Sequence, residues 1–320
     1  TRGVYRTRTS YYPWDKPEGW ETGSRREAYL SRLYPIPNLS DTEIFKGIDP
    51  RYASGYDNQT RRISVREEWK QVLRYNFYMG DFRWTGFDYL GESWGWPART
   101  NNYGIIDLAG FPKDDYYLYQ SLWTTKPMIH LLPHWTHPGM EGVKIPIVVY
   151  TNQDAAELFL NGRSLGKKQV DKDALQIVWQ VPYQPGTLTA VAYRDGKIVA
   201  RDSSITAGAP VRIRLSADKK TLRANRRDVV QVTVDIMDIR HHFVPTDCDD
   251  TIHFEVTGPY KLLGVESGDI LDTAPQKVLW RKVFMGKALL MLQATGDPGI
   301  IHIRAVARGL RPAEISITTR

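Results

Sequence analysis

Residues 186–205 read GTLTAVAYRDGKIVARDSSI, two runs rich in β-branched and alternating residues on either side of Asp195-Gly196. An Asp-Gly pair between two such runs is typical of a two-residue β-hairpin, whose turn requires positive φ at both positions. Comparable runs, separated by turn pairs such as Asn161-Gly162 and Pro185-Gly186, precede this hairpin. Short strands at this spacing predict an antiparallel β-sandwich over residues 127–206.

A second series of strand-like runs follows in residues 207–320. DVVQVTVDIMD at 228–238, TIHFEVTG at 251–258 and IIHIRAVARG at 300–309 are examples. The stretch TAGAPVRI, residues 206–213, has the composition of a linker. The sequence therefore predicts a second antiparallel sandwich after it.

The first 126 residues follow a different pattern. Residues 64–79, SVREEWKQVLRYNFYM, predict a helix capped by Ser64 and ending at Gly80. The aromatic run FRWTGFDYL, residues 82–90, predicts a buried strand, and a second helix is expected near residues 113–123. Helix, strand, loop and helix together indicate an α/β unit. The expected apolar face of the first helix consists of Trp69, Val72, Leu73 and Phe77.

Composition and charge exclude several classes of protein. The 320 residues carry 43 Lys and Arg against 36 Asp and Glu, a net charge of +7, but the basic residues are scattered pairs at expected turns. We therefore expect no nucleic-acid partner. No apolar run approaches the ~18 residues that a membrane helix needs, so no membrane partner is expected either.

Cysteine and histidine usage gives no metal site. Cys248 is the only cysteine, which excludes an internal disulfide and a multi-thiolate site. His130, His134 and His137 have helical spacing, but Pro133 and Pro138 argue against a helix there. No metal ligand or cofactor is predicted within this chain.

Several collinear motifs resemble a known family. They are WTGFDYLGE (84–92), YGIIDLAGFPKDDYYLYQSLW (103–123), VVYTNQDAAELFLNGRSLG (148–166), VPYQPGTLTAVAYRDG (181–196), GVESGD (264–269) and WRKVFMGKALLMLQA (280–294). Together they resemble the C-terminal half of glycoside hydrolase family 2 β-galactosidases. The resemblance implies a multidomain fold. In it, residues 1–126 form the C-terminal part of a TIM (β/α)8 barrel, with residues 82–90 as its eighth strand, followed by two immunoglobulin-like antiparallel β-sandwiches, 127–206 and 207–320.

The resemblance also implies a retaining exo-β-galactosidase that uses two catalytic glutamates. Both would lie upstream of Thr1, so no catalytic residue is assigned within the chain, and the chain alone is expected to be inactive. Asp88 and Glu92 do not replace them. On an extended segment they would stand ~13 Å apart, whereas a retaining pair is separated by ~5–5.5 Å. An upstream segment or chain that completes the barrel and a homo-oligomer are the expected protein partners.

The resemblance places five substrate-binding residues near the end of the barrel. Trp84 is expected to form an apolar platform under a sugar ring. The other four are Asp88, Glu92, Trp96 and Tyr103. Asp88 and Glu92 have an alternative role as loop anchors through an arginine such as Arg99. Trp94 and Trp96 can either form an outer subsite or pack on neighbouring domains.

The residue at position 103 bears on the sugar. Related β-glucuronidases carry an Asn-x-Lys pair in this region, where the lysine meets the sugar carboxylate. Here the stretch reads Asn101-Asn102-Tyr103-Gly104, which favours a neutral sugar, galactose first. The alternatives are β-glucuronidase, β-mannosidase or a non-catalytic carbohydrate-binding or scaffolding module.

The family resemblance carries three further expectations. A Mg²⁺ or Na⁺ ion is expected only in the full-length enzyme, and a periplasmic or secreted location is expected from the family. Trp135, Trp179 and Tyr183 are candidate carbohydrate contacts on the first sandwich. A bracing role for the sandwiches is the more frequent alternative.

Overall fold

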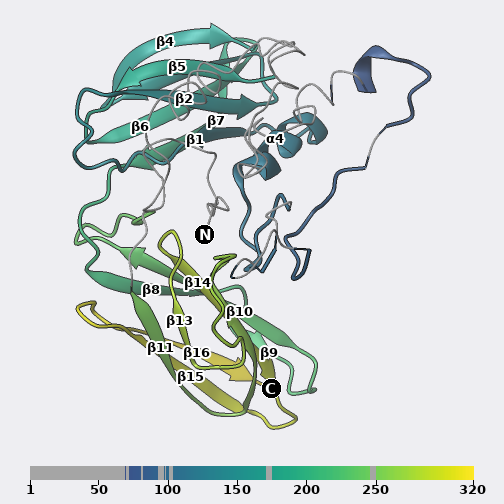
Figure 1. Ribbon diagram of the computed structural model, residues 1–320, viewed down its shortest axis with the longest axis vertical. Coiled ribbons are helices and arrows are strands. Elements are labelled where there is room, and N and C mark those ends of the chain that lie inside the picture. The colour runs from purple at the N-terminus through teal and green to yellow at the C-terminus, as the bar shows by residue number, and fades with distance from the viewer. Residues whose placement is uncertain are drawn as a thin grey trace. The chain divides into compact units, whose positions relative to one another are not determined.

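The computed structural model describes residues 69, 72–80, 82–92, 97, 99–100, 104–170, 175–245 and 250–320. The chain divides into two compact units, Thr1–Thr206 and Ala207–Arg320 (Figure 1). In the first unit, helix α4 (Asp114–Trp123) carries Asp114 and Asp115 in its first turn, as expected from the sequence. No described helix is both long and apolar enough to cross a membrane.

The described strands of the first unit form an antiparallel sandwich of two sheets, ordered β1-β2-β5 and β4-β3-β6-β7. Side chains from both sheets enclose one core that includes Trp135, Ile147 and Leu158. Alternate residues face this core because successive strand side chains point to opposite faces. The strands are β1 (Ile129–Leu132), β2 (Lys144–Thr151), β3 (Ala155–Leu160), β4 (Arg163–Gln169), β5 (Ile177–Pro182), β6 (Thr187–Arg194) and β7 (Lys197–Ile205).

Hairpin turns fix the register of this sandwich. Asp195 and Gly196 have φ of 50° and 76°, and Asn161 and Gly162 have φ of 52° and 80°. Positive φ at both positions matches the right-handed twist of the flanking strands. The two turns predicted from Asp-Gly and Asn-Gly are therefore confirmed.

Asn161 also joins its turn to the one before β6. Its Oδ1 accepts a hydrogen bond from the Thr187 backbone N–H at 2.8 Å, and its Nδ2 donates to the Pro185 carbonyl at 3.2 Å. A Cβ on Gly186 would lie 1.8 Å from that Oδ1. Glycine at 186 is therefore required by the side chain at 161.

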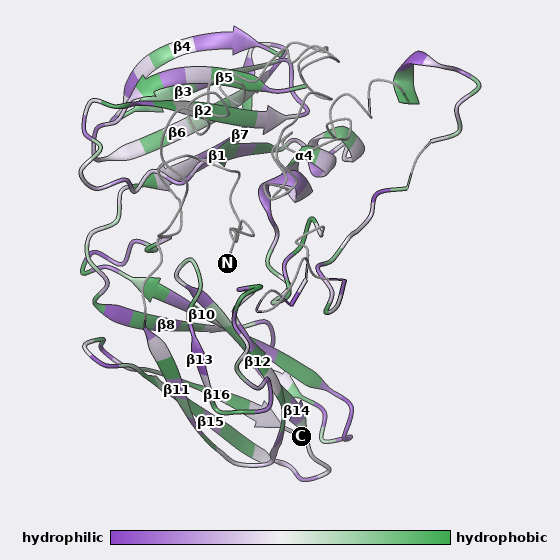
Figure 2. Ribbon diagram, viewed as in Figure 1, coloured by the Kyte–Doolittle hydropathy of each residue, from purple (hydrophilic) through white to green (hydrophobic). Residues whose placement is uncertain are grey.

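The second unit is also a sandwich, formed by the four-stranded sheet β12-β14-β10-β8 and the five-stranded sheet β13-β11-β15-β16-β9. Figure 2 shows hydrophobic stretches along the strands of both units, as expected for sheets that pack on a core. The strands are β8 (Arg212–Ala217), β9 (Thr221–Leu222), β10 (Val229–Met237), β11 (Thr251–Thr257), β12 (Tyr260–Glu266), β13 (Trp280–Lys282), β14 (Lys287–Ala294), β15 (Gly299–Val306) and β16 (Ala313–Thr319).

Two predictions for the N-terminal region differ from the structure. The helix expected over 64–79 includes Trp69 and residues 72–74 but ends at Arg74, not at Gly80; its start lies outside the described residues. Leu73 and Phe77, expected on its buried face, are 64% and 83% exposed. Helices of this length depend on packing of their apolar face, and these two side chains have little.

The strand expected over residues 82–90 is not regular either. Within this stretch the described pairing is a single bridge between Phe87 and Ile106. Phe82, Phe87 and Leu90 are more than half exposed, so the stretch is not a buried strand here. A barrel strand needs paired neighbours on both sides, and the described residues provide one short partner.

The candidate sugar contacts on the first sandwich were also wrong. Trp135, Trp179 and Tyr183 are at most 4% exposed. The Trp135 indole N–H donates to the Gln184 carbonyl at 2.9 Å, and its ring packs edge-on against Tyr183. These aromatic residues form the sandwich core instead of a ligand surface.

A buried arginine holds the long connection between β12 and β13. Arg281 is fully buried, and its guanidinium donates to Asp272 Oδ2 at 2.7 Å and to the carbonyls of Pro275 at 2.7 Å and Val265 at 3.1 Å. A buried charge is tolerated only when it is paired and hydrogen-bonded. The Arg281 guanidinium therefore holds residues 265–275 against the rest of the second unit.

We expect Arg281→Ala to lower the free energy of unfolding by about 3–5 kcal/mol, because it leaves Asp272 and two carbonyls without their partner. Chemical denaturation measures this change. Arg304→Ala is the control, since Arg304 also binds carboxylates but on an exposed sheet face; it should change the midpoint little. Equal effects of the two substitutions would contradict the role given to Arg281.

A second charged residue fixes the loop before β10. The Asp228 carboxylate accepts hydrogen bonds from Lys219 Nζ at 2.7 Å, from the Arg223 N–H at 3.1 Å and from the Val229 N–H at 3.2 Å. These donors lower the pKa of the Asp228 carboxyl from 3.8 to about 2. Its ionised form is therefore favoured in the folded state.

A carboxyl whose pKa is lowered by folding stabilises the fold above its ordinary pKa of 3.8 and loses that contribution as the pH falls through about 2. Asp228→Asn should therefore lower the melting temperature at pH 7, by a difference that shrinks as the pH falls from 3.8 through about 2 and vanishes below it. Thermal melts of both proteins across this range test the prediction. A difference that persists at the lowest pH would show that the carboxylate charge is not responsible.

Candidate functional site

The candidate site is built on a short pairing between residues 85–88 and 104–106. The N–H groups of Ile105 and Ile106 donate to the carbonyls of Thr85 and Gly86, and the Asp88 N–H donates to the Ile106 carbonyl at 2.8 Å. A Cβ at Gly104 would lie 2.1 Å from the Asp88 backbone nitrogen. The close approach of the two backbones thus requires glycine at 104.

A buried ion pair lies at this crossing. Lys113 Nζ is 2.8 Å from Asp88 Oδ2, and the two side chains are 2% and 0% exposed. The Gly104 N–H donates to Asp88 Oδ1 at 2.7 Å. Burial raises the pKa of the Asp88 carboxyl, which the Lys113 ammonium opposes. Burial also lowers the pKa of Lys113, which the Asp88 charge opposes.

The segment between these partners is held by Asp107. Its Oδ1 accepts hydrogen bonds from the N–H groups of Ala109 at 2.8 Å and Phe111 at 2.9 Å. The Lys113 N–H in turn donates to the Ile105 carbonyl at 2.9 Å. These hydrogen bonds therefore place Lys113, at the start of α4, beside Asp88.

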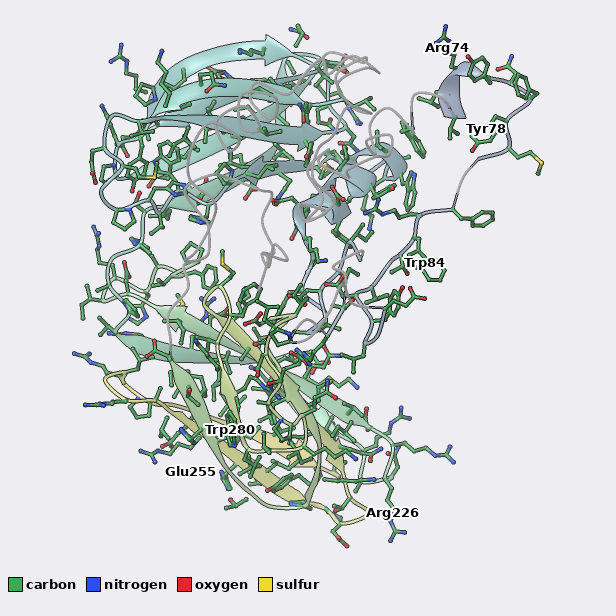
Figure 3. All side chains as sticks on the ribbon, viewed as in Figure 1. Arg74, Tyr78, Trp84, Arg226, Glu255 and Trp280 are labelled. Atoms are coloured by element: carbon green, nitrogen blue, oxygen red, sulfur yellow. The ribbon has the colours of Figure 1, made fainter. Side chains whose placement is uncertain are left out.

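An exposed aromatic and acidic cluster lies on the same stretch. The Trp84 indole N–H donates to Tyr89 Oη at 2.9 Å, and Tyr89 Oη donates to Glu92 Oε2 at 2.5 Å. The Trp84 and Tyr89 rings meet edge-on, with centroids 5.9 Å apart. Trp84, labelled in Figure 3, is 64% exposed. The cluster offers an apolar ring face beside a carboxylate, the combination that suits a sugar.

The predicted site residues therefore fall into three groups. Trp84 and Glu92 are joined through Tyr89, while Asp88 is turned into the protein toward Lys113. Trp96 and Tyr103, like Trp94, lie outside the described residues. Tyr89 was not predicted as a site residue, although its position in the sequence between Trp84 and Glu92 could have indicated that it contacts both.

The suggested anchoring of Asp88 by Arg99 differs from the structure. The Asp88 carboxylate is bound by Lys113 and by the Gly104 N–H. The extended geometry assumed for residues 88–92 was also wrong. Gly91 and Glu92 have φ of 103° and 50°, so the chain turns there. Among the described residues, no three His, Cys, Asp or Glu side chains are placed to bind a metal.

Comparisons with known protein families match one domain in each unit. Residues 213–316 match the glycoside hydrolase family 2 C-terminal domain 5, and residues 142–200 match a domain of unknown function, DUF4982. The chain belongs to glycoside hydrolase family 2, as the resemblance of its motifs implied.

The relatives that match this chain are named after two different activities. A β-galactosidase of Bacteroides ovatus, BoGH2A, is 44% identical over 260 residues, which are 80% of this chain and 30% of that protein. A protein of Formosa agariphila with a provisional β-glucuronidase name is 41% identical over 316 residues, 93% of this chain and 29% of that protein. This chain therefore spans about 30% of the length of these curated relatives.

A solved structure agrees with the fold. A β-glycosidase from Bacteroides vulgatus is 41% identical and superposes with a TM-score of 0.81. The match covers 99% of this chain and 40% of that one. The described sheets of both units are thus those of a glycoside hydrolase family 2 protein; the barrel portion expected for residues 1–126 is not shown.

The buried ion pair makes a specific prediction about stability. Lys113→Met should lower the free energy of unfolding by about 3–5 kcal/mol, because it leaves the Asp88 carboxylate buried without its cation. The double variant Asp88→Leu with Lys113→Met should recover part of this loss, since no uncompensated charge remains. Denaturation of the wild type, both single variants and the double variant completes the cycle. Strictly additive losses would show that the two side chains are not coupled.

Proposed function

We propose that the full-length protein is a retaining glycoside hydrolase that removes terminal β-galactosyl residues from oligo- or polysaccharides. Membership of glycoside hydrolase family 2 supports a glycosidase. The choice of sugar is carried by Tyr103, which by the family resemblance takes the place of the lysine that meets a uronate in related β-glucuronidases. Tyr103 precedes Gly104, whose N–H binds Asp88, so this part of the chain connects directly to the candidate site.

We assign different tasks to the acidic residues of this site. Trp84 stacks under the sugar ring, and Glu92, oriented by Tyr89, accepts hydrogen bonds from sugar hydroxyls. Asp88 acts as a positioning residue, because its carboxylate is engaged by Lys113 and Gly104. Trp96 and Tyr103 complete the rim in this proposal. The nucleophile and acid/base are two glutamates of the full-length protein, in the double-displacement scheme of retaining enzymes.

The proposal includes the domain organisation expected from the family. Residues 1–126 complete a catalytic barrel together with another segment of the protein, residues 127–206 form the first sandwich, and residues 207–320 form the second. The second candidate activity is a β-glucuronidase, which the name of the Formosa agariphila relative supports.

The test is hydrolysis of p-nitrophenyl β-galactoside and β-glucuronide by the full-length protein. We expect a higher kcat/KM for the galactoside, and we expect Tyr103→Lys to raise the relative kcat/KM for the glucuronide by supplying a cation for its carboxylate. Preference of the wild type for the glucuronide would overturn the choice of galactose. The 320-residue chain alone should give no turnover.

The proposed platform is tested separately. Trp84→Ala should lower kcat/KM for the galactoside about tenfold or more, because the stacking surface is removed. Phe77→Ala is a matched control, since Phe77 is also an exposed aromatic residue but has no contact with Tyr89 or Glu92 among the contacts described. An unchanged kcat/KM for Trp84→Ala would remove this residue from the site.

A further inference from the structure

The five-stranded sheet of the second unit has one face on the core and one face toward solvent. Ile252, Phe254, Ile301 and Ile303 point to the core, while the alternating residues of β11 and β15 are exposed or partly exposed. The register places the outward residues in cross-strand rows. These rows are Trp280, His253 and Val306; Glu255, Arg304 and Glu314; and Thr257, His302 and Ser316.

Trp280 stands at the edge of this face. Trp280 is 37% exposed. Among the Phe, Tyr and Trp residues described in the second unit, it is the one whose side chain is more than one third exposed. It pairs with His253, so Glu255 is its diagonal neighbour across β11, about 7–8 Å away between Cα atoms. The Trp280 indole and the polar row that contains Glu255 are therefore close enough for one sugar ring to contact both (Figure 3).

The polar rows are held in place by their own contacts. Arg304 donates to Glu255 Oε2 at 2.8 Å and contacts Glu314 Oε1 at 3.0 Å. His302 Nδ1 and Ser316 Oγ are 3.0 Å apart. Exposed ion pairs add little to stability, but they hold planar donors and acceptors in a fixed arrangement, which lowers the entropy cost of binding a polyhydroxyl ligand.

We propose that this face, formed by β13, β11, β15 and β16, binds a neutral glycan chain. Trp280 packs under the apolar face of one sugar, and Glu255, Arg304 and His302 hydrogen-bond to hydroxyls of that sugar and its neighbour. Glu255 and Glu314 on this face are balanced by Arg304 and Lys282, so the face has no net charge with its histidines neutral, which suits a neutral chain better than a polyanion. The choice of a sugar among neutral polar ligands rests on the proposed function.

The experiment is affinity electrophoresis of the 320-residue chain in native gels that contain soluble β-1,4-galactan, dextran or heparin. We expect a neutral polysaccharide to retard the wild type, and Trp280→Ala to weaken the apparent affinity about tenfold or more. Trp280→Phe should retain part of the binding. Arg304→Ala should weaken binding as well, so the test does not depend on one variant.

Two exposed residues outside this sheet serve as matched controls. Ile239→Ala removes an exposed apolar side chain of the same unit, and Ile198→Ala removes one of the first unit; neither should change the retardation. Retardation by heparin alone, retardation that Trp280→Ala leaves intact, or no retardation by any neutral polysaccharide would overturn the proposal. Binding through Trp280 without galactoside turnover by the full-length protein would uphold this proposal while refuting the β-galactosidase assignment.

Discussion

The ion pair of Asp88 and Lys113 is the contact on which the candidate site depends. It joins the aromatic stretch to the start of α4, and both charges are buried. Because an uncompensated buried charge is far more costly than an exposed one, replacing either side chain alone lowers the stability of the fold. The exposed cluster of Trp84, Tyr89 and Glu92 is thereby carried on a stretch whose backbone is fixed at Asp88 and Gly104.

The two sandwiches could be predicted from sequence because their signals are local. Period-two polarity and turn pairs such as Asp195-Gly196 each specify a strand or a reversal without knowledge of distant residues. Trp179 shows where this reasoning fails. Its aromatic character suggested a ligand surface, but composition does not say to which face of a strand a side chain points, and the ring is buried in the core.

The N-terminal region was less predictable for a different reason. The apolar pattern around Leu73 and the aromatic run from Phe82 both require other segments to pack against or pair with. A periodic pattern indicates that a helix or strand needs such a segment, but it does not identify the segment. The same limit applies to the site. Sequence named Asp88 as a candidate, but its pairing with Lys113, 25 positions along the chain, follows from the turn at Asp107 and the close approach at Gly104.

The contact of Asn161 with Gly186 has a consequence for sequence variation. The amide of Asn161 fills the space that any side chain at 186 would need, and it also bonds to the backbone on both sides of that glycine. A larger residue at 186 meets this amide and, at a φ of 143°, is strained even where position 161 has become smaller. Related chains with this turn should therefore keep glycine at 186 even where position 161 has changed, so that glycine marks the turn in sequences for which only the order of residues is known.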